Sequence, residues 1–463
     1  MPKISGFRER FAAWAAGVAG VMEKYFPDAF IFALLATAFV FILAVALGQP
    51  VAAICNHWGK GFWSLLTFTL QMAMIIVTGF VLAASPPVYW VIRKLATWPR
   101  TPRQAVCWVA LFSLMTSLLN WGFSLIFSGL LAKEVAQRVK GTDFRAVAAS
   151  SFLGLGGVWA QGLSSSAALL MATPGALPAP LVKITGVIPL TQTLFIWQNY
   201  LSIAVLILIT LIVAYFYTPM PAQARTMENL GIAYEPLQFG KTPADLRTPG
   251  EWLEHSPLLT LLFFALSTTY LMMTLRSGGL SALDLNMVNL IFLSWGMLLH
   301  WTPASFLKAV AKATPATAGV LLQFPFYAGI FGIMVYAPEG YSSISESLAR
   351  LFVKGTTPQS FPLLVSIYSA VLGLLIPSGG AKWMIEAPYV MEAAKLHGVH
   401  LGWTVNIYNI AEALPNLINP FWMLPILGLF NMRARDLMGY SLIMFLFHLP
   451  VVLFLCSALA KTF

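Results

Sequence analysis

Long apolar stretches recur along the chain, and short polar segments separate them. A helix needs about 20 apolar residues to cross the hydrocarbon core of a membrane. The pattern therefore predicts an all-α polytopic membrane protein. The stretches expected to cross the membrane are residues 30–48, 63–83, 146–172, 198–217, 257–275, 287–300, 313–335, 404–430 and 437–459.

Two further apolar stretches, residues 105–132 and 361–389, are interrupted near their middles by helix-breaking residues. Lys and Arg residues cluster on both sides of residues 105–132, and basic loops favour the cytoplasmic side of a membrane. This stretch is therefore expected to enter the membrane and return as a re-entrant hairpin, and the N-terminus is expected to be cytoplasmic. The expected hairpin tips are residues 120–124 and 377–380.

The same distribution of charge places residues 361–389 in a second re-entrant hairpin that enters from the outer side. Arg350 and Lys354 then fall on the outer side, against the usual bias. Their segment, residues 341–354, has the pattern of an interfacial amphipathic helix, which tolerates basic residues.

The order of elements is expected twice: two helices, a hairpin, an interrupted helix and a final helix. One extra crossing between the copies inverts the second relative to the first. Inverted-topology repeats with discontinuous helices are typical of secondary transporters. The predicted organisation is an N-terminal interfacial segment (1–28), a first transmembrane repeat (29–218), a cytoplasmic linker (219–256), an extra crossing helix (257–285) and a second, inverted repeat (286–463).

Composition supports a membrane protein, because 59% of the residues are apolar, only 10% are charged and the mean hydropathy is +0.78. A soluble enzyme, a nucleic-acid binder and a secreted disulfide scaffold are excluded. The net charge of +10 is assigned to basic loops that set orientation. No P-loop, nucleophile elbow or zinc-protease motif occurs in the sequence. We therefore expect no enzyme activity, no cofactor and no dedicated metal site.

The breaks in the helical pattern are the places where binding chemistry is expected. Half-helix N-termini present unpaired N–H groups that suit an anion, and freed carbonyls with Ser or Asn oxygens suit a small cation. Taken singly, the glycines also fit close helix packing and the serines fit bonds to the preceding turn. A Na⁺ ion is an option near Asn120 and Ser378. The candidate binding residues at the breaks are Asn120, Gly122, Ser124, Ser164, Ser165, Ser166, Ser378, Gly379, Gly380, Asn416 and Asn419.

Lys382, Glu386 and Glu412 are ionisable residues inside predicted spans, where charge is costly and usually functional. Lys382 and Glu386 are four residues apart and share a helix face, so they are expected to pair. The pair is either a neutralised structural unit, or Lys382 helps to hold an anionic substrate while a glutamate takes up protons. Gln71 and Gln323 are expected to bridge helices rather than line the site.

Several segments in order along the chain carry a resemblance to the bacterial short-chain fatty acid transporter family, which carries acetoacetate- and butyrate-type substrates. The resemblance implies a member of the ion-transporter superfamily, in which a scaffold holds a transport domain that moves in elevator fashion, and a homodimer. It also implies that the hairpin tips and broken helices form the substrate and ion sites. The segments are Gly61-Phe62-Trp63, Asn120-Trp121-Gly122-Phe123, Ala172-Thr173-Pro174-Gly175, Gln323-Phe324-Pro325-Phe326-Tyr327-Ala328-Gly329, Pro377-Ser378-Gly379-Gly380 with Trp383, and Pro420-Phe421-Trp422.

One departure from the family pattern involves two residues. The family pattern reads Pro-Ser-Gly-Gly-Gly-x-Trp, with an uncharged amide four residues beyond x. Here x is Lys382 and the later residue is Glu386. The charged pair leaves open a different small carboxylate or a zwitterion as substrate, and it leaves the coupling ion open.

The sequence thus predicts a secondary active transporter in the bacterial inner membrane, moving a small monocarboxylate with H⁺ or Na⁺. An ion or anion channel is the second hypothesis, and paired re-entrant hairpins are compatible with it. An intramembrane enzyme is the third, although no nucleophile accompanies Glu412 and Lys382. The expected partners are the carboxylate, the lipid bilayer and a second copy of the chain, without nucleic acid.

Overall fold

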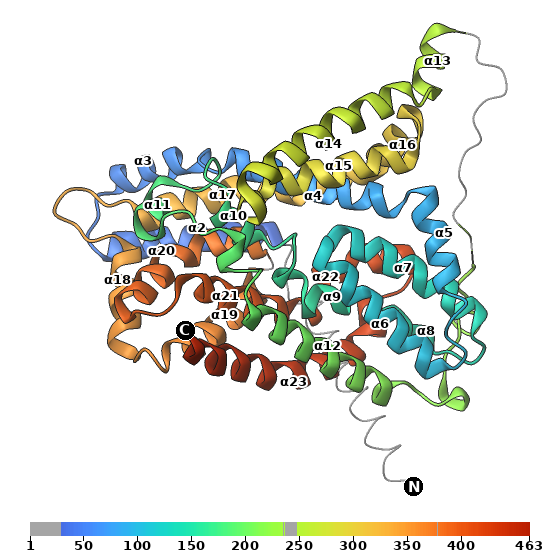
Figure 1. Ribbon diagram of the computed structural model, residues 1–463. Helices are drawn as coiled ribbons and strands as arrows, with labels where there is room; N and C mark the ends of the chain where they lie inside the picture. Colours follow the sequence, from blue (N-terminus) through green and yellow to red (C-terminus); the bar gives the residue numbers. More distant parts are fainter. Residues whose placement is uncertain (1–28, 235, 237–247, 377) are drawn as a thin grey trace.

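The computed structural model describes residues 29–234, 236, 248–376 and 378–463, and within these ranges all regular secondary structure is helical (Figure 1). The expected interfacial segment, residues 1–28, lies outside the described residues. The expectation of an all-helical protein with several apolar spans is confirmed. Described stretches long and apolar enough to cross a membrane are Leu66–Ala83, Pro102–Leu119, Trp197–Tyr217, Leu258–Ala282, Pro303–Val335 and Ala434–Thr462.

The first half of the chain alternates long helices with short ones. In order, its main elements are α2 (Ala29–Ala46), α3 (Val51–Phe62), α4 (Leu66–Ala83), α5 (Pro86–Leu95), α6 (Pro102–Leu119), α7 (Trp121–Arg138), α8 (Phe144–Ser150), α9 (Leu153–Gly157), η1 (Trp159–Gln161), α10 (Ser166–Ala172), α11 (Ala179–Thr185), η2 (Leu190–Gln192) and α12 (Trp197–Tyr217).

The second half follows the linker and has the same alternation. Its elements are α13 (Pro249–His255), α14 (Leu258–Gly278), η4 (Gly279–Ala282), α15 (Leu285–His300), α16 (Pro303–Ala313), η5 (Thr314–Thr317), α17 (Ala318–Val335), α18 (Ile344–Gly355), α19 (Phe361–Leu375), α20 (Gly379–His397), α21 (Leu401–Ala413), η6 (Leu414–Leu417), α22 (Pro420–Phe430) and α23 (Ala434–Leu459).

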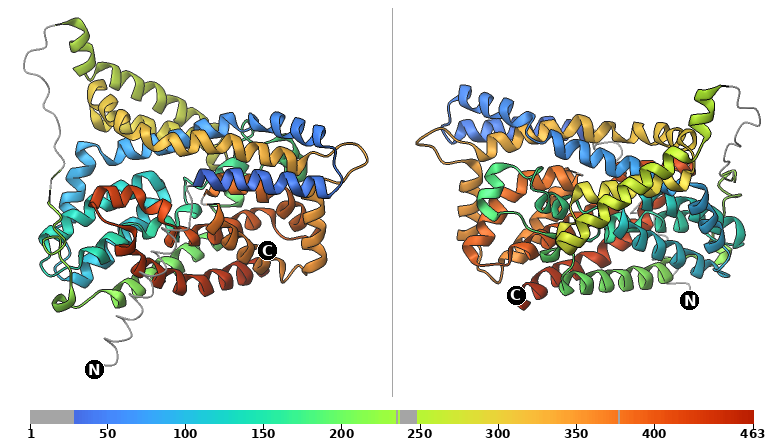
Figure 2. Two further views of the ribbon diagram at one scale, coloured as in Figure 1. Left: turned by 180° about the vertical axis from the view of Figure 1, so that it is seen from behind. Right: turned by 45° about the horizontal axis from the view of Figure 1, so that its top comes forward.

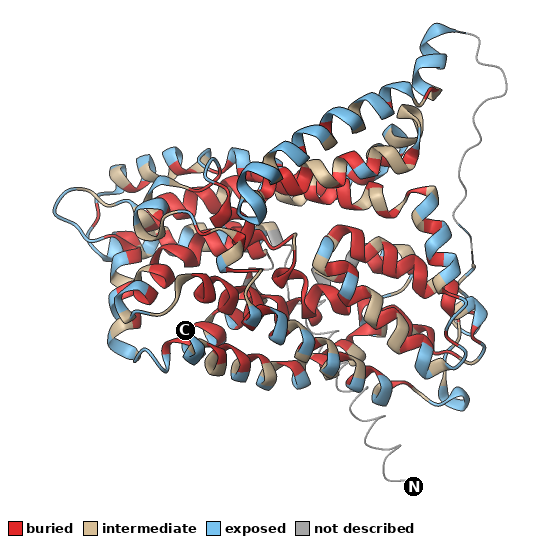
Figure 3. Cartoon of the chain, viewed as in Figure 1, coloured by how far each residue is buried: buried red, intermediate tan, exposed pale blue. Residues whose placement is uncertain are grey.

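The helices are arranged in layers (Figures 1 and 2). One layer contains α2, α3, α4 and α14 to α17, where α4 packs against α15 and α17 packs against α2 and α3. On the opposite side α12 packs against α23, and the elements around α6–α10 and α19–α22 lie between. Burial follows this order, because the middle elements are buried on nearly all sides whereas α14 is exposed along most of its apolar length (Figure 3). An exposed apolar helix of this kind faces lipid.

Two helix pairs cover the stretches expected to form hairpins, and we name them hairpin 1 (α6 and α7) and hairpin 2 (α19 and α20). That they are re-entrant stays a prediction. In hairpin 1 the helices are interrupted at Asn120 alone, whose side-chain Oδ1 accepts a hydrogen bond from Phe123 N at 3.0 Å and so caps α7. In hairpin 2 the Oγ of Ser378 accepts from Ala381 N and caps α20. Pro377 of the expected tip lies outside the described residues.

Residues 146–172, expected to be one interrupted helix, are more fragmented than the sequence suggested, and they form α8, α9, η1 and α10. Close packing explains the extra breaks: a Cβ on Gly154 would collide with the Ser113 carbonyl, and one on Gly156 would collide with Leu417. Most of residues 341–354 lies in a helix, α18 (Ile344–Gly355), but its membrane-interface location stays a prediction. Three further short helices, α3, α5 and α16, were not expected from the apolar stretches.

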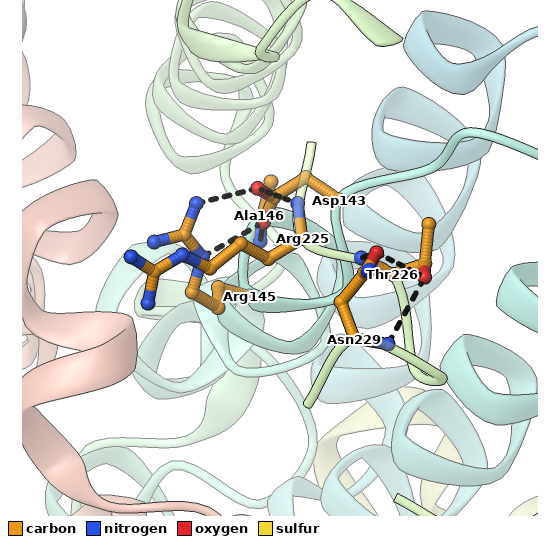
Figure 4. Close-up of polar contacts among 6 residues, drawn as sticks. All are labelled: Asp143, Arg145, Ala146, Arg225, Thr226 and Asn229. Atoms are coloured by element: carbon orange, nitrogen blue, oxygen red, sulfur yellow. Dashed lines mark hydrogen bonds and ion pairs between the residues drawn. The ribbon is translucent and has the colours of Figure 1, made fainter. Parts of the chain in front are cut away.

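The linker docks on the N-terminal end of α8 (Figure 4). Asp143, which caps α8 by accepting from Ala146 N at 3.1 Å, also accepts from Arg225 N at 3.0 Å and pairs with Arg145 at 2.6 Å. A turn follows in which Thr226 and Asn229 bond each other. These contacts hold the described beginning of the linker against the loop between α7 and α8.

A buried carboxylate extends this anchor. Glu134 in α7 is 2% exposed, and its Oε1 accepts hydrogen bonds from Tyr89 of α5 at 2.7 Å and Tyr234 of the linker at 2.6 Å. Burial and the nearby Glu134 carboxylate raise the pKa of the Tyr234 hydroxyl, so it remains a donor at neutral pH. The base of hairpin 1 is therefore tied to both α5 and the linker.

Candidate functional site

The tip of hairpin 1 is held against α4. Asn120 is fully buried, and its Nδ2 donates to the carbonyl oxygen of Ile75 at 3.1 Å while its Oδ1 caps α7. Gly79 of α4 makes the approach possible, because a Cβ there would collide with Asn120 Oδ1. Asn120 therefore already has protein partners on both polar atoms, and its predicted contact with Na⁺ is untested.

The same tip contacts the gap before α10, residues 162–165, which we name break 1. Trp121 N donates to Ser164 Oγ at 3.0 Å, and Leu163 N donates to the Leu118 carbonyl at 2.7 Å. Gly162 is essential to this fit, since a Cβ would collide with Leu118. Hairpin 1 and break 1 therefore form one packed unit.

The tip of hairpin 2 lies on the other side of break 1. A Cβ on Gly380 would be 3.2 Å from the Cβ of Ser166 and 3.1 Å from Cε1 of Phe68 in α4. A Cβ on Gly379 would be 3.0 Å from both Glu412 Oε2 and Trp159 Cη2. The two glycines thus sit in a narrow space between α4, η1, α10 and α21.

The second broken helix completes the arrangement. We name residues 418–419, between η6 and α22, break 2. Asn416 Nδ2 donates to the Leu155 carbonyl at 3.1 Å, and the rings of Trp121 and Trp422 meet edge-on at 5.6 Å. The hairpin tips and broken helices therefore adjoin one another. The sequence analysis predicted one shared site if these four segments met. Their role in binding stays a prediction.

The predicted ion pair is present. Lys382 Nζ lies 3.4 Å from Glu386 Oε1, and both side chains are fully buried. Lys382 Nζ also donates to the Ser369 carbonyl of α19 at 2.6 Å and lies 4.7 Å from the ring centre of Tyr408. The ammonium group therefore points into the junction of hairpin 2 with α21 and has partners from three helices.

Glu412 is different, because it has no ion pair among the described residues. Its side chain is 1% exposed, and its Oε2 has no hydrogen-bond donor in the part of the chain that the structure describes. A buried unpaired carboxylate is costly, so a proton or a cation must neutralise it. Because Glu412 lies beside Gly379, the neutralising proton or cation is needed at the tip of hairpin 2.

The N-terminus of α20 is the clearest place for an anion. The N–H groups of Gly379 and Gly380 have no hydrogen-bond acceptor among the described residues, and neither residue has a side chain to block access. In hairpin 1, by contrast, the first N–H of α7, that of Trp121, is already bonded to Ser164 Oγ. The third N–H of each helix is bonded to its capping side chain, Phe123 N to Asn120 and Ala381 N to Ser378. Unpaired N–H groups and the helix dipole both favour negative charge.

Some predicted residues have structural partners instead of facing the space between the tips. Ser124 donates to the Ser113 carbonyl at 2.8 Å and accepts from Thr116, so it joins the two arms of hairpin 1. Ser165 caps α10 through Ala168 N. Gly122 lies against Ile76, and Asn419 is buried within break 2.

Four residues near the tips were missed by sequence reasoning: Phe68, Trp159, Ser369 and Tyr408. Phe68 and Trp159 flank the two glycines, and the Tyr408 hydroxyl donates to the Gly379 carbonyl. Aromatic residues inside apolar spans give no sequence signal, so only the fold could identify them. Gln71 bridges helices as expected, donating to Asn286 of α15 at 2.7 Å.

Comparison with known proteins identifies the family. The family model described as "Short chain fatty acid transporter" matches residues 12–459. The chain belongs to the short-chain fatty acid transporter family. It is 36% identical over 446 residues to an Escherichia coli K12 protein, covering 96% of this chain and 97% of that one. A Haemophilus influenzae relative is 36% identical over 436 residues, covering 93% and 96%. Both relatives are named "Putative short-chain fatty acid transporter".

A solved structure supports the fold. The YdaH transporter of Alcanivorax borkumensis superimposes with a TM-score of 0.59 at 15% identity, covering 92% of this chain and 98% of that one. This short-chain fatty acid transporter family member is therefore a multi-pass membrane protein with a transporter fold, and it is not an enzyme.

Proposed function

We propose that the chain is a secondary active transporter that moves a short-chain fatty acid or similar small monocarboxylate, of butyrate or acetoacetate type, across the bacterial inner membrane. The observation that carries the proposal is the pair of N–H groups at Gly379 and Gly380, which have no acceptor among the described residues and stand at the start of a 19-residue helix. A substrate carboxylate would accept hydrogen bonds from these groups. Lys382, in the first turn of α20, adds positive potential behind them.

The surroundings of the two glycines suit a short aliphatic chain. Phe68 is fully buried and Trp159 is 4% exposed. A Cβ on Gly380 would be 3.1 Å from Phe68, and one on Gly379 would be 3.0 Å from Trp159. Aromatic and apolar walls with few polar groups are typical of small-molecule sites. Close packing of this kind favours a small acid over a long-chain one.

Glu412 supports coupling to a cation. If Glu412 is charged, it repels a carboxylate at Gly379, because like charges this close interact strongly in a buried site. A proton on Glu412, or a Na⁺ ion beside it, removes the repulsion. Binding of the substrate is thereby linked to binding of one cation, which is the requirement for symport.

The packing supports two inverted repeats, at residues 29–218 and 286–463, joined by the linker 219–256 and the extra crossing 257–285. Helix α4 packs against α15, α16 and α7, and α17 packs in the corresponding way against α2, α3 and α20. In the proposed cycle, hairpins 1 and 2 with their broken helices move together against the layer of α2–α4 and α14–α17. The resemblance to the family further suggests a homodimer with a cytoplasmic N-terminus.

The test is counterflow in proteoliposomes preloaded with unlabelled butyrate, with labelled butyrate outside. We expect labelled butyrate to enter, and acetoacetate and propionate to compete. Butylamine has the same chain length without the carboxylate, and it should not compete. Competition by γ-aminobutyrate alone would instead assign a zwitterionic substrate, and conductive flux without saturation would assign a channel.

A further inference from the structure

The Lys382 ammonium group is enclosed at a point where three elements of the proposed moving unit meet. It lies between Ser369 in α19, Glu386 in its own helix and Tyr408 in α21, and the side chain is fully buried. Among the described residues the Lys382 side chain has no solvent-exposed surface. Lys382 therefore cannot contact a substrate carboxylate without a rearrangement of hairpin 2.

The partners of this ammonium are those that a small cation takes from a protein. They are a backbone carbonyl oxygen at 2.6 Å, a carboxylate oxygen at 3.4 Å and an aromatic face at 4.7 Å from its centre. The Ser369 hydroxyl orients the carboxylate by donating to Glu386 Oε2 at 2.5 Å. Hard oxygen ligands of this kind bind Na⁺ as well as ammonium groups.

The chain also leaves space for the ammonium. Gly373, one turn after Ser369, faces it: a Cβ there would be 3.4 Å from Lys382 Nζ and 2.9 Å from Cγ of Pro415 in η6. Glu386 Oε1 has no hydrogen bond among the described residues, so its charge is compensated only by the ion pair. Removing the lysine side chain would leave a buried cavity with an uncompensated carboxylate and free carbonyl oxygen.

We infer that the Lys382 side chain is a built-in cation, which fills a Na⁺-type site formed by Glu386, the Ser369 carbonyl and the Tyr408 ring. The inference rests on the proposed function for its mechanistic meaning. With this site filled permanently, no Na⁺ ion is needed there in any step of transport, and cation coupling falls to Glu412. A purely structural ion pair would not discriminate between Na⁺ and other monovalent cations after the lysine is removed.

The test is thermal unfolding of the purified full-length protein in detergent, with NaCl compared with KCl and choline chloride at equal ionic strength. Lys382→Ala opens the cavity and leaves Glu386 unpaired. We expect Na⁺ to raise its Tm by at least about 3 °C over K⁺ or choline in a saturable way, because a ligand that binds only the folded state stabilises it. The Na⁺-specific rise in Tm of the wild-type protein should be at least about 3 °C smaller than that of Lys382→Ala.

Two matched variants isolate the site. Lys382→Met removes the charge but fills the cavity, and Lys382→Ala with Glu386→Gln keeps the cavity but removes the carboxylate. Neither should gain the Na⁺-specific shift. The inference is wrong if folded Lys382→Ala gains no such shift, or if Lys382→Met gains the same one.

Folding itself gives a second readout. If Lys382→Ala is unstable, it should be recovered as a monodisperse protein when it is extracted in Na⁺ but not in K⁺. Recovery of the double variant, with no recovery of Lys382→Ala in either salt, would contradict the inference. These measurements contain no carboxylate substrate, so a failure of the transport proposal leaves their outcome intact, and the reverse also holds.

Discussion

The backbone N–H of Trp121 donates a hydrogen bond to Ser164 Oγ at 3.0 Å, and this bond joins the tip of hairpin 1 to break 1. Ser164 is fully buried and the bond is partly buried, so loss of the Ser164 hydroxyl leaves the Trp121 N–H without its protein acceptor. Ser164→Ala should therefore lower stability by about 1–3 kcal/mol. Thermal unfolding in detergent measures the loss. The matched control Ser277→Ala, at an exposed serine in α14 that bonds only its own helix, should change little.

Gly380 has no room for a side chain, since a Cβ would be 3.1 Å from Phe68 and 3.2 Å from Ser166. Gly380→Ala should raise the KM for butyrate at least tenfold, because the methyl group occupies the path of the carboxylate to the Gly379 and Gly380 N–H groups. Gly59→Ala, in α3 with nothing within 4 Å of the added atom, should leave KM unchanged. If Gly380→Ala and Gly59→Ala have the same KM for butyrate, the substrate does not bind at this tip.

Glu412→Gln keeps the shape of the side chain but cannot carry a proton. If Glu412 couples, the variant should retain butyrate exchange while losing its acceleration by an inward proton gradient. Initial uptake rates at fixed internal pH and stepped external pH measure this. Glu339→Gln, at an exposed loop residue, should keep the wild-type profile. A Glu412→Gln variant that is still stimulated by the proton gradient would assign proton coupling to another group.

The buried carboxylate of Glu134 depends on two tyrosine hydroxyls, from Tyr89 and Tyr234. Tyr234→Phe and Tyr89→Phe should each destabilise the protein by about 1–3 kcal/mol, since a bond to a charged acceptor is lost in a buried place. The double variant should lose more than either, and the Arg138 contact with Glu134 at 3.5 Å should remain. Tyr200→Phe, at a tyrosine that is 54% exposed, is the control. If Tyr234→Phe, Tyr89→Phe and the double variant all melt at the wild-type temperature, the linker anchor is unimportant for stability.

Much of the fold was predictable from local signals in the sequence. Apolar length identified the long spans, and Asn120 and Ser378 identified the hairpin tips, because a capping residue after an apolar helix both ends one helix and begins the next. The Lys382–Glu386 pair followed from i,i+4 spacing alone. These features depend on residues near each other in the chain.

The remainder depended on contacts between distant residues. The extra breaks in residues 146–172 arise where Gly154 meets Ser113 and Gly156 meets Leu417, and no local pattern encodes those partners. The amphipathic helices α3, α5 and α16 are too short to stand out among apolar stretches. Whether Lys382 faces the substrate space or the helix junction was equally undetermined, since both faces of α20 are buried.

The most direct test of the account is uptake of radiolabelled butyrate into proteoliposomes under an imposed inward proton gradient, an imposed Na⁺ gradient, or neither. Secondary active transport predicts saturable uptake that overshoots the equilibrium level under one of the two gradients, and no overshoot when that gradient is collapsed by an ionophore. Saturable uptake that stops at equilibrium under every gradient would contradict secondary active transport and describe a passive carrier.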